Sequence, residues 1–198
     1  ANTGFDPISF NFLYSNGTEK LLKGSSVFAQ ARMLDGLNRF SAGFQYSLPN
    51  GRTDAQVEAL YFWRKDSTDL TYLINPQEWD LNALNASINT SVRHRYDYAM
   101  GRGDLLFETR SSAPGSAAGY GWLRLKAVNT TSAAGLEFRT RVFAQYGSGS
   151  TPRESALYLA GASPEDLMEN KYTRSVGMVP YDWSGFGAGV NHFQQGGG

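Results

Sequence analysis

The 198-residue sequence has no cysteine, no excess of either charge and no long hydrophobic run. Without cysteine, disulfide scaffolds, thiolate nucleophiles and cysteine-ligated zinc or iron–sulfur centres are excluded. The 18 basic and 18 acidic residues cancel and form no basic run, so nucleic acid is not an expected partner. No apolar run reaches the ~18 residues of a transmembrane helix. This criterion does not exclude a membrane β-barrel, because barrel strands alternate lipid-facing and lumen-facing residues.

Alternation of apolar and polar residues is the strongest pattern in the sequence. In residues 38–48 apolar side chains occupy every second position and polar side chains occupy the positions between them, as in an extended strand with one apolar face. The same period of two recurs in seven further segments, near residues 8–15, 26–33, 56–64, 84–93, 104–108, 123–127 and 136–146. We therefore predict about eight strands before Gly147.

Turn-forming residues separate these segments and predict antiparallel hairpins. The predicted turns are Asp35–Gly36, Pro49–Arg52, Gly101–Gly103, Ala113–Gly115 and Asn129–Thr131. No segment before residue 150 has a sustained apolar period of 3.6, so we expect no crossover helix between parallel strands. The predicted fold class is all-β, with antiparallel strands in up-and-down order.

Strand length and loop length favour a transmembrane β-barrel over a sandwich. The segments are about ten residues long, enough to cross a bilayer at a ~45° tilt, whereas strands in globular proteins are most often roughly five or six residues long. Connections after the fourth and eighth segments are long, and those after the third, fifth and seventh are short, as in outer-membrane barrels. The tight Asp35–Gly36 turn is an exception to this alternation.

The two faces of such a barrel would meet lipid and lumen. Lipid-facing residues are predicted at Phe40, Phe44, Leu48, Phe138 and Val142, and interfacial aromatics at Tyr14, Tyr46, Trp63 and Tyr146. Charged residues of the opposite face are predicted to line the lumen: Arg39, Glu58, Arg93, Glu108, Arg124, Lys126, Glu137, Arg139 and Arg141. Two interpretations stay open, namely a selectivity surface or a lumen that receives an inserted loop, and an interior ladder of salt bridges with no transport role.

The chain is predicted to divide into three parts. Residues 1–147 supply about eight transmembrane strands, residues 148–185 form a long extracellular loop with a short helix, and residues 186–198 begin a further strand or a glycine-rich loop. Residues 163–166 suit the first turn of that helix, which is expected to finish over Leu167–Asn170. The strand directions implied by the loop lengths predict an incomplete portion of a larger barrel.

Residues 147–161 carry a family resemblance. They contain Pro152–Glu154 ahead of Tyr158–Gly161, and a glycine run stands at Gly196–Gly198. This arrangement resembles the stretch before the lumen-inserted loop in barrels of the Omp85/surface-antigen D15 superfamily, where a proline and an Arg/Glu pair precede an aromatic-Leu-Gly-Gly element. Similar barrels are fused to zinc aminopeptidase-like domains of the M1 kind. The resemblance implies an outer-membrane scaffold, pore, or assembly and secretion component.

No catalytic residue, cofactor or metal site is predicted. The two histidines, His94 and His192, have no second histidine or carboxylate at ligand spacing. No glycine loop has the spacing of a phosphate-binding motif followed by Lys-Ser or Lys-Thr. A barrel-embedded hydrolase would need a serine or aspartate beside His94 in space, which the sequence does not reveal.

The predicted function is that of a membrane-embedded β-barrel segment in the bacterial outer membrane. Its expected partners are outer-membrane lipid and, through the long loops, other outer-membrane or surface proteins. One alternative is a secreted β-sandwich that binds glycans through exposed aromatics such as Trp79, Trp122 and Trp183. Another alternative is a barrel that anchors a peptidase-like domain.

Overall fold

The computed structural model describes residues 9–18, 20, 22–34, 37–64, 82–158, 165 and 194–195. Its eight long strands are β1 (Ser9–Gly17), β2 (Ser25–Leu34), β3 (Leu37–Ser47), β4 (Thr53–Arg64), β5 (Asn85–Tyr98), β6 (Gly101–Ser112), β7 (Tyr120–Ala133) and β8 (Leu136–Gly149). A short 3-10 helix, η2 (Arg153–Ser155), and two-residue strands, β9 (Leu157–Tyr158) and β10 (Gln194–Gln195), follow. Within the described ranges, no helix has the length and apolar character needed to traverse a membrane.

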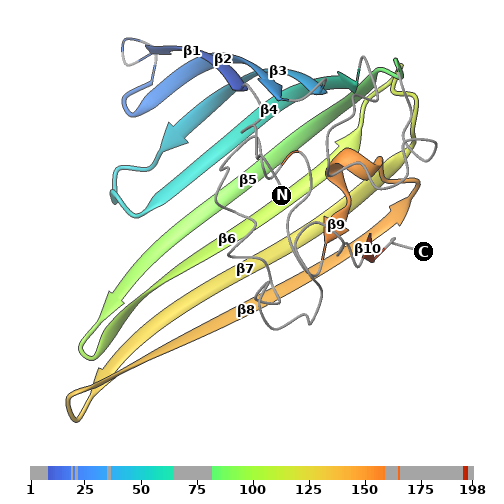
Figure 1. Ribbon diagram of the computed structural model, residues 1–198. Coiled ribbons are helices and arrows are strands. Elements are labelled where there is room, and N and C mark those ends of the chain that lie inside the picture. Colours follow the sequence, from blue (N-terminus) through green and yellow to red (C-terminus); the bar gives the residue numbers. More distant parts are fainter. Residues whose placement is uncertain are drawn as a thin grey trace, which may run out of the picture.

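The eight long strands form one antiparallel sheet in sequence order, β1 to β8. Neighbours in sequence are neighbours in the sheet, so the predicted all-β, up-and-down arrangement is confirmed. The sheet is strongly twisted, and β1–β3 turn away from the long strands β5–β8 (Figure 1). In the part of the chain that the structure describes, β1 and β8 are not paired with each other, so the sheet is open and not closed into a barrel.

Two predicted turns are wrong, because both lie inside strands. Gly101–Gly103 begins β6, and Asn129–Thr131 lies within β7. The chain reverses at residues 99–100 and 134–135 instead. At the second reversal both residues have positive φ, 52° for Ala134 and 78° for Gly135, as a tight two-residue hairpin turn requires. The predicted Asp35–Gly36 turn lies outside the described residues.

Pairing between aromatic residues and glycines explains the first of these errors. Tyr98 lies opposite Gly101 and Tyr96 lies opposite Gly103. A Cβ atom at either glycine would collide with the tyrosine ring across the pair. Because these glycines have no side chain, the tyrosine rings pack directly on their backbone. This cross-strand packing holds Gly101 and Gly103 in the strand despite the preference of glycine for turns.

Register sorts the side chains into two faces, because directly paired residues point to the same side of a sheet. One apolar row crosses five strands through Ala55, Val92, Phe107, Leu125 and Ala144. The row next to it, on the opposite side, is polar and runs through Gln56, Ser91, Glu108, Arg124 and Gln145. We call the apolar side the outer face and the polar side the inner face.

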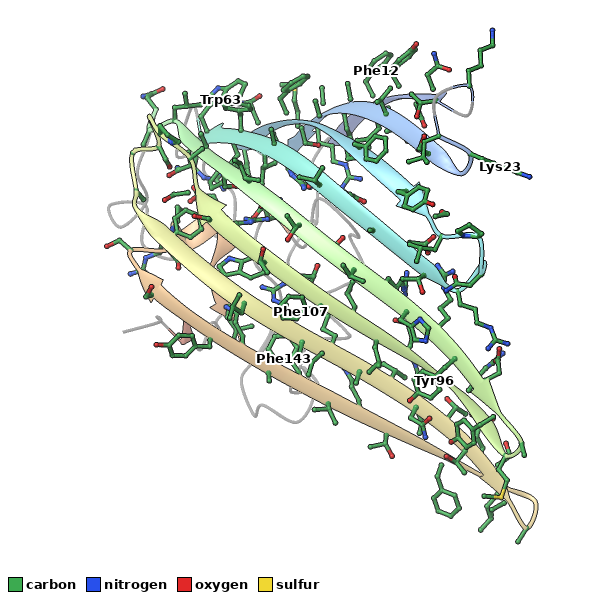
Figure 2. All side chains as sticks on the ribbon, turned by 180° about the vertical axis from the view of Figure 1, so that it is seen from behind. Phe12, Lys23, Trp63, Tyr96, Phe107 and Phe143 are labelled. Carbon is green, nitrogen blue, oxygen red and sulfur yellow. The ribbon has the colours of Figure 1, made fainter. Side chains whose placement is uncertain are left out.

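Burial is concentrated on the inner face. Leu37, Leu60 and Phe62 form a small core there, and all three are completely buried. On the outer face, by contrast, Phe107 is 45 % exposed and Leu125 is 40 % exposed (Figure 2). The polar inner face is thus more buried than the apolar outer face, the inverse of the arrangement expected for a protein in water.

Gly43 of β3 offers a test of this packing. It pairs with Phe28, and a Cβ atom at Gly43 would lie 2.7 Å from the Phe28 ring and would also meet the Val57 carbonyl oxygen. We expect Gly43→Ala to lower the free energy of unfolding by about 1–3 kcal/mol, because the added methyl group overpacks this site. Urea unfolding followed by tryptophan fluorescence measures the change.

The matched control is Gly121→Ala on β7. The nearest atom to a Cβ at Gly121 is the Arg110 carbonyl oxygen, 3.5 Å away, which is an ordinary contact. The control should therefore unfold close to the wild-type midpoint. Equal loss of stability in both variants would show that glycine itself, and not the Phe28 ring, matters at these positions.

Candidate functional site: the charged hollow

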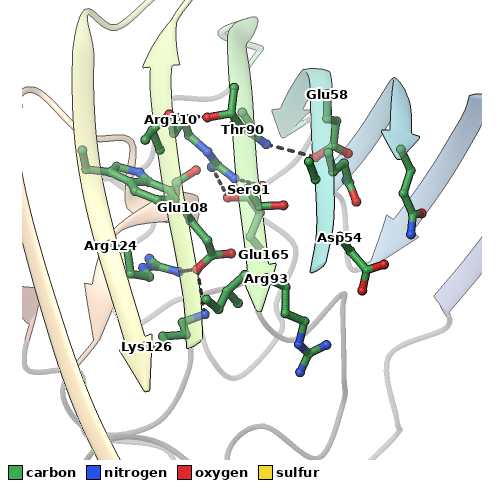
Figure 3. Close-up of a pocket in the computed structure, with 18 of the residues that line it drawn as sticks. Asp54, Glu58, Thr90, Ser91, Arg93, Glu108, Arg110, Arg124, Lys126 and Glu165 are labelled. Atoms are coloured by element: carbon green, nitrogen blue, oxygen red, sulfur yellow. Dashed lines mark hydrogen bonds and ion pairs between the residues drawn. The ribbon is translucent and has the colours of Figure 1, made fainter. Parts of the chain in front are cut away.

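A cavity of about 590 Å³ lies against the inner face of β3–β7 (Figure 3). We call it the hollow. Six of the predicted lumen residues line it: Arg39, Glu58, Arg93, Glu108, Arg124 and Lys126. Ser155 and Glu165 line it from beyond β8. Glu137, Arg139 and Arg141 belong to the same face by register, but they are exposed on β8 and do not line the hollow.

Glu165 is held between arginines from two different strands. Arg110 of β6 donates from Nη1 to Glu165 Oε2 at 2.6 Å and from Nη2 to Glu165 Oε1 at 3.3 Å. Arg39 of β3 lies between two carboxylates, with Nε 3.6 Å from Glu165 Oε1 and Nη2 3.6 Å from Glu58 Oε1. All four residues are buried. We call them the Glu165 cluster.

A second buried ion pair joins the segment after β8 to the sheet. Arg64 Nε of β4 donates to Glu154 Oε1 of η2 at 3.1 Å, and Arg64 is only 1 % exposed. Glu154 is one of the residues that carry the family resemblance. Because Glu154 and Glu165 both contact arginines of the inner face, the chain after β8 folds back over that face.

Across the rest of the hollow, the sign of the charge alternates from strand to strand. The ion pairs that cross between neighbouring strands are Asp54–Arg95 at 2.9 Å, Arg93–Asp104 at 2.7 Å, Glu108–Lys126 at 3.0 Å and Glu108–Arg124 at 3.8 Å. In this region β4 and β6 present acids, whereas β5 and β7 present bases. These side chains are partly exposed, so each pair contributes only about 0–1 kcal/mol.

Trp122 lies in the hollow between Arg110 and Arg124. The guanidinium carbon of Arg124 is 4.4 Å from the indole centroid and that of Arg110 is 5.2 Å from it. Such cation–π contacts contribute roughly 0.5–2 kcal/mol each. Trp122 is buried, so its predicted role as an exposed glycan-binding aromatic is wrong. Trp79 and Trp183 lie outside the described residues.

The lumen residues predicted from sequence omit four members of the buried ion pairs: Arg64, Arg110, Glu154 and Glu165. They also omit Asp54, Arg95 and Asp104, which form ion pairs across the hollow. Arg64 and Arg110 are in phase with Glu58 and Glu108 on their strands, so the period of two is a sufficient signal for them. No periodic signal marks the two glutamates, because they lie outside the long strands. They reach their arginine partners across 90 and 55 residues of sequence.

The two buried glutamates have pKa values displaced in opposite directions. Burial alone raises the pKa of Glu165, but the charges of Arg110 and Arg39 and the hydrogen bonds from Arg110 outweigh it and hold the pKa at about 2. For Glu154 burial prevails, and its pKa is raised despite the contact with Arg64, with the nearby Glu165 charge adding to the rise. Glu165 is therefore the carboxylate that the site stabilises in its charged form.

Residues predicted to face lipid belong to the outer face. Phe40, Phe138 and Val142 are exposed there, and Phe44 is partly exposed. Leu48 lies in the connection between β3 and β4. No described side chain of a second large sheet covers this face, because the only other sheet in the described residues is the two-residue pair β9–β10.

The predicted interfacial aromatics lie at different levels of the outer face. Trp63 is next to the end of β4, opposite Asn38. Tyr146 is three residues from the end of β8, which runs in the same direction as β4, whereas Tyr14 and Tyr46 are near the ends of β1 and β3, which run the opposite way. Trp63 and Tyr146 therefore lie toward one end of the outer face, and Tyr14 and Tyr46 lie toward the other.

Further aromatics, Tyr61, Tyr96 and Tyr98, also mark the two ends of the outer face. Tyr61 and Trp63 lie at one end. Tyr96 and Tyr98 stack at the other end, with ring centroids 6.2 Å apart. Both tyrosine hydroxyls donate to Asn129 Oδ1, at 3.3 Å from Tyr96 and 3.2 Å from Tyr98. The alternation predicts a strand that ends near residue 93, whereas β5 extends to Tyr98, so Tyr96 and Tyr98 are not among the predicted aromatics.

His94 has a structural partner on the outer face. Its Nδ1 atom is 2.9 Å from Thr53 Oγ1, and its ring stacks on Tyr96. Among the residues that the structure describes, no group of three His, Cys, Asp or Glu side chains is arranged to hold a metal ion. His192 and the short helix predicted to finish at Leu167–Asn170 lie outside the described residues.

Comparison with known proteins identifies no relative: no family model, no curated protein and no solved structure matches the chain. The geometry of the hollow itself offers ion pairing, anchoring of the segment after β8, and a space lined mainly by polar side chains.

Removal of the Glu165 charge should release the segment after β8. Glu165→Gln leaves Arg39 and Arg110 buried without their carboxylate, which costs about 3–5 kcal/mol. We expect trypsin cleavage after Arg153 to increase on the order of 100-fold as the segment detaches. Glu137→Gln is the matched control, because Glu137 is exposed on β8. Equal protection of both variants would contradict an anchoring role for Glu165.

The same carboxylate predicts a loss of stability in acid. Glu165 has a pKa of about 2 in the fold and about 4.3 in an unfolded chain. Its stabilisation is therefore complete at neutral pH and is lost as the pH falls from about 5 toward 2. Glu154 has the opposite effect on stability. Because its pKa is raised in the fold, protonated Glu154 stabilises the folded state at low pH, and this stabilisation is lost as the pH rises through the raised pKa.

Urea midpoints measured between pH 7 and pH 3 separate these contributions. Wild-type protein should lose stability below about pH 5, whereas Glu165→Gln should start lower at pH 7 and change less with pH. Parallel pH profiles for the two proteins would show that Glu165 is not the group responsible.

Proposed function

We propose that this chain is a transmembrane β-barrel segment of the bacterial outer membrane. Its outer face would meet lipid, and its inner face would surround a lumen that receives the segment after β8. The observation that carries the proposal is the inverted polarity of the sheet. The inner face buries Arg39, Glu58, Arg64 and Arg110, while the outer face exposes Phe40, Val57, Ile88, Val92, Phe107, Leu123, Leu125 and Val142.

Lipid accounts for this inversion better than water does. Soluble monomers rarely expose a contiguous apolar patch above a few hundred Å², and each Å² of apolar surface moved out of water is favourable by about 25 cal/mol. The apolar row from Ala55 to Ala144 alone spans five strands. In a bilayer that surface is in contact with hydrocarbon, and the strand-to-strand hydrogen bonds satisfy the backbone.

The height of the apolar band also supports a membrane location. Tyr61 pairs with Ala86 on β5, and Tyr96 follows Ala86 by about ten residues on the same strand. Ten residues extend ~33 Å along a strand, which becomes ~25 Å across the bilayer at a tilt of ~40°. Outer-membrane barrels have an apolar band of ~25 Å between aromatic girdles. Two aromatic pairs, Tyr61 with Trp63 and Tyr96 with Tyr98, lie at the two ends of the outer face and suit these girdles.

The lumen is best interpreted as a place that receives and anchors a segment of the chain. Glu154 and Glu165 follow β8 and contact three arginines of the inner face. This arrangement favours a scaffold or an assembly and secretion component, as the resemblance to the Omp85/surface-antigen D15 superfamily implies, over a permanently open pore. A barrel that anchors a peptidase-like domain is compatible with the same geometry, since the anchor would be the same sheet.

A glycan-binding β-sandwich has less support. Such a sandwich needs a second sheet against the apolar face, and the other sheet within the described ranges has only two residues in each strand. Of the tryptophans expected to bind glycans, Trp122 is covered by Arg110 and Arg124.

Membrane association tests the proposal directly. Expressed with its natural flanking residues, the protein should sediment with membranes, resist extraction by carbonate, and migrate differently on SDS gels before and after heating. A protein that is folded and monodisperse in buffer without detergent would overturn the proposal.

Adjacent residues on opposite faces give a sharper test. Phe44 lies in a row with Val27 and Val57, near the middle of the apolar band, and Gln45 lines the hollow. Phe44→Arg should cost about 2–4 kcal/mol of stability in lipid, because it places a charge at the bilayer centre. Gln45→Arg should not carry this cost. Urea unfolding in lipid vesicles measures both, and equal effects would show that the outer face does not meet hydrocarbon.

A further inference from the structure

β8 is an open edge of the sheet in the described residues. It is 14 residues long and pairs with β7 alone. Every residue from Leu136 to Val142 is exposed. An edge strand presents a row of backbone groups that another strand can pair with, and a bilayer would leave such groups without water as a partner.

The charges on this edge break the alternation that runs through the hollow. From β4 to β7 the ion pairs alternate acid, base, acid and base. β8 then places Arg139 and Arg141 on the same inner face, opposite Thr130 and Val128 of β7, together with a single acid, Glu137, opposite Ser132. Within the described part of the chain, neither arginine has a carboxylate within ion-pair distance. No described strand lies on the far side of β8, and continued alternation would place an acidic strand there.

We propose that the free edge of β8 binds a further antiparallel strand with carboxylates opposite Arg139 and Arg141 and apolar residues opposite Phe138, Thr140 and Val142. The inner positions would continue the cross-strand ion pairs, and opposite charges directly across a pair stabilise a sheet. The apolar positions would extend the outer face. Only this apolar half rests on the proposed membrane function; the edge and its two arginines do not depend on it.

A second copy of this chain is a poorer partner. Two β8 strands paired antiparallel along their full length, with like faces matched, place Arg139 opposite Gly147 and Arg141 opposite Gln145. The other open edge, β1, carries no acidic residue. β8 itself carries one carboxylate on this face, Glu137, but the self-pairing register that sets it opposite Arg141 also sets Arg139 opposite Arg139, where like charges repel. Neither edge therefore supplies carboxylates for both arginines, so the charges favour a strand that is more acidic than either edge.

Synthetic strands and a charge reversal test the proposal. The probe is a fluorescent 13-residue peptide with Glu at the positions facing Arg139 and Arg141 and Val at the alternate positions; its control has Lys in place of Glu. Binding of the peptides to the full chain is followed by anisotropy, in detergent and in buffer. We expect wild type to bind the Glu peptide about tenfold more tightly than the Lys peptide.

The double variant Arg139→Glu with Arg141→Glu should reverse this preference. A misfolded protein would lose binding to both peptides, so a gain for the Lys peptide identifies the charges themselves. Equal affinity for the two peptides, or a preference unchanged by the reversal, would overturn the proposal, as would self-association through β8 at the same concentrations. Failure of the membrane assay with an intact peptide preference would overturn the proposed function and leave the acidic edge partner in place.

Discussion

The register between the eight paired strands is the constraint on which the rest of this structure depends, because it decides which side chains share a face. In a pleated strand successive residues point to opposite faces, so a slip of one residue would exchange the two faces completely. The register holds Phe44, Val57 and Leu123 on one side and Glu58, Glu108 and Arg124 on the other, from β3 to β7. The apolar surface, the hollow and the unpaired charges of β8 all follow from that register.

The buried Glu165 carboxylate of the inner face can stay charged because it has several cationic partners. Glu165 receives two hydrogen bonds from Arg110 and a third contact from Arg39. An isolated buried carboxylate would instead raise its pKa and become neutral. The cluster is costly to break once formed, since loss of one partner leaves the others desolvated. It therefore specifies where the segment after β8 lies more than it adds to net stability.

The hollow and the open edge are two parts of one electrostatic pattern. Acids and bases on neighbouring strands neutralise each other across β4–β7, so the inner face carries little unbalanced charge there. On β8 the pattern stops with Arg139 and Arg141, which have no ion-pair partner among the described residues. The proposed acidic neighbour of β8 would supply these partners.

Local pattern was enough to predict the strands, their antiparallel order and which residues share a face, because the period of two is a property of each strand alone. It also predicted most residues of the hollow, such as Arg39 and Glu58. It did not predict the reversals at residues 99–100 and 134–135. Tyrosine rings opposite Gly101 and Gly103 extend the first pair of strands past residues that usually turn, and the Asn129 side chain, bonded to Tyr98, does so in β7.

The sequence by itself determined the all-β class, the two-faced strands and the residues that face each way. Only the tertiary structure decided which face is covered, that Glu154 and Glu165 reach Arg64 and Arg110, and that the sheet stays open between β1 and β8. Alternation within one strand shows that its two faces differ, but it does not show which face is buried. The contacts that bury the inner face join residues far apart in the chain, and they depend on the twist of the sheet and on the register between strands.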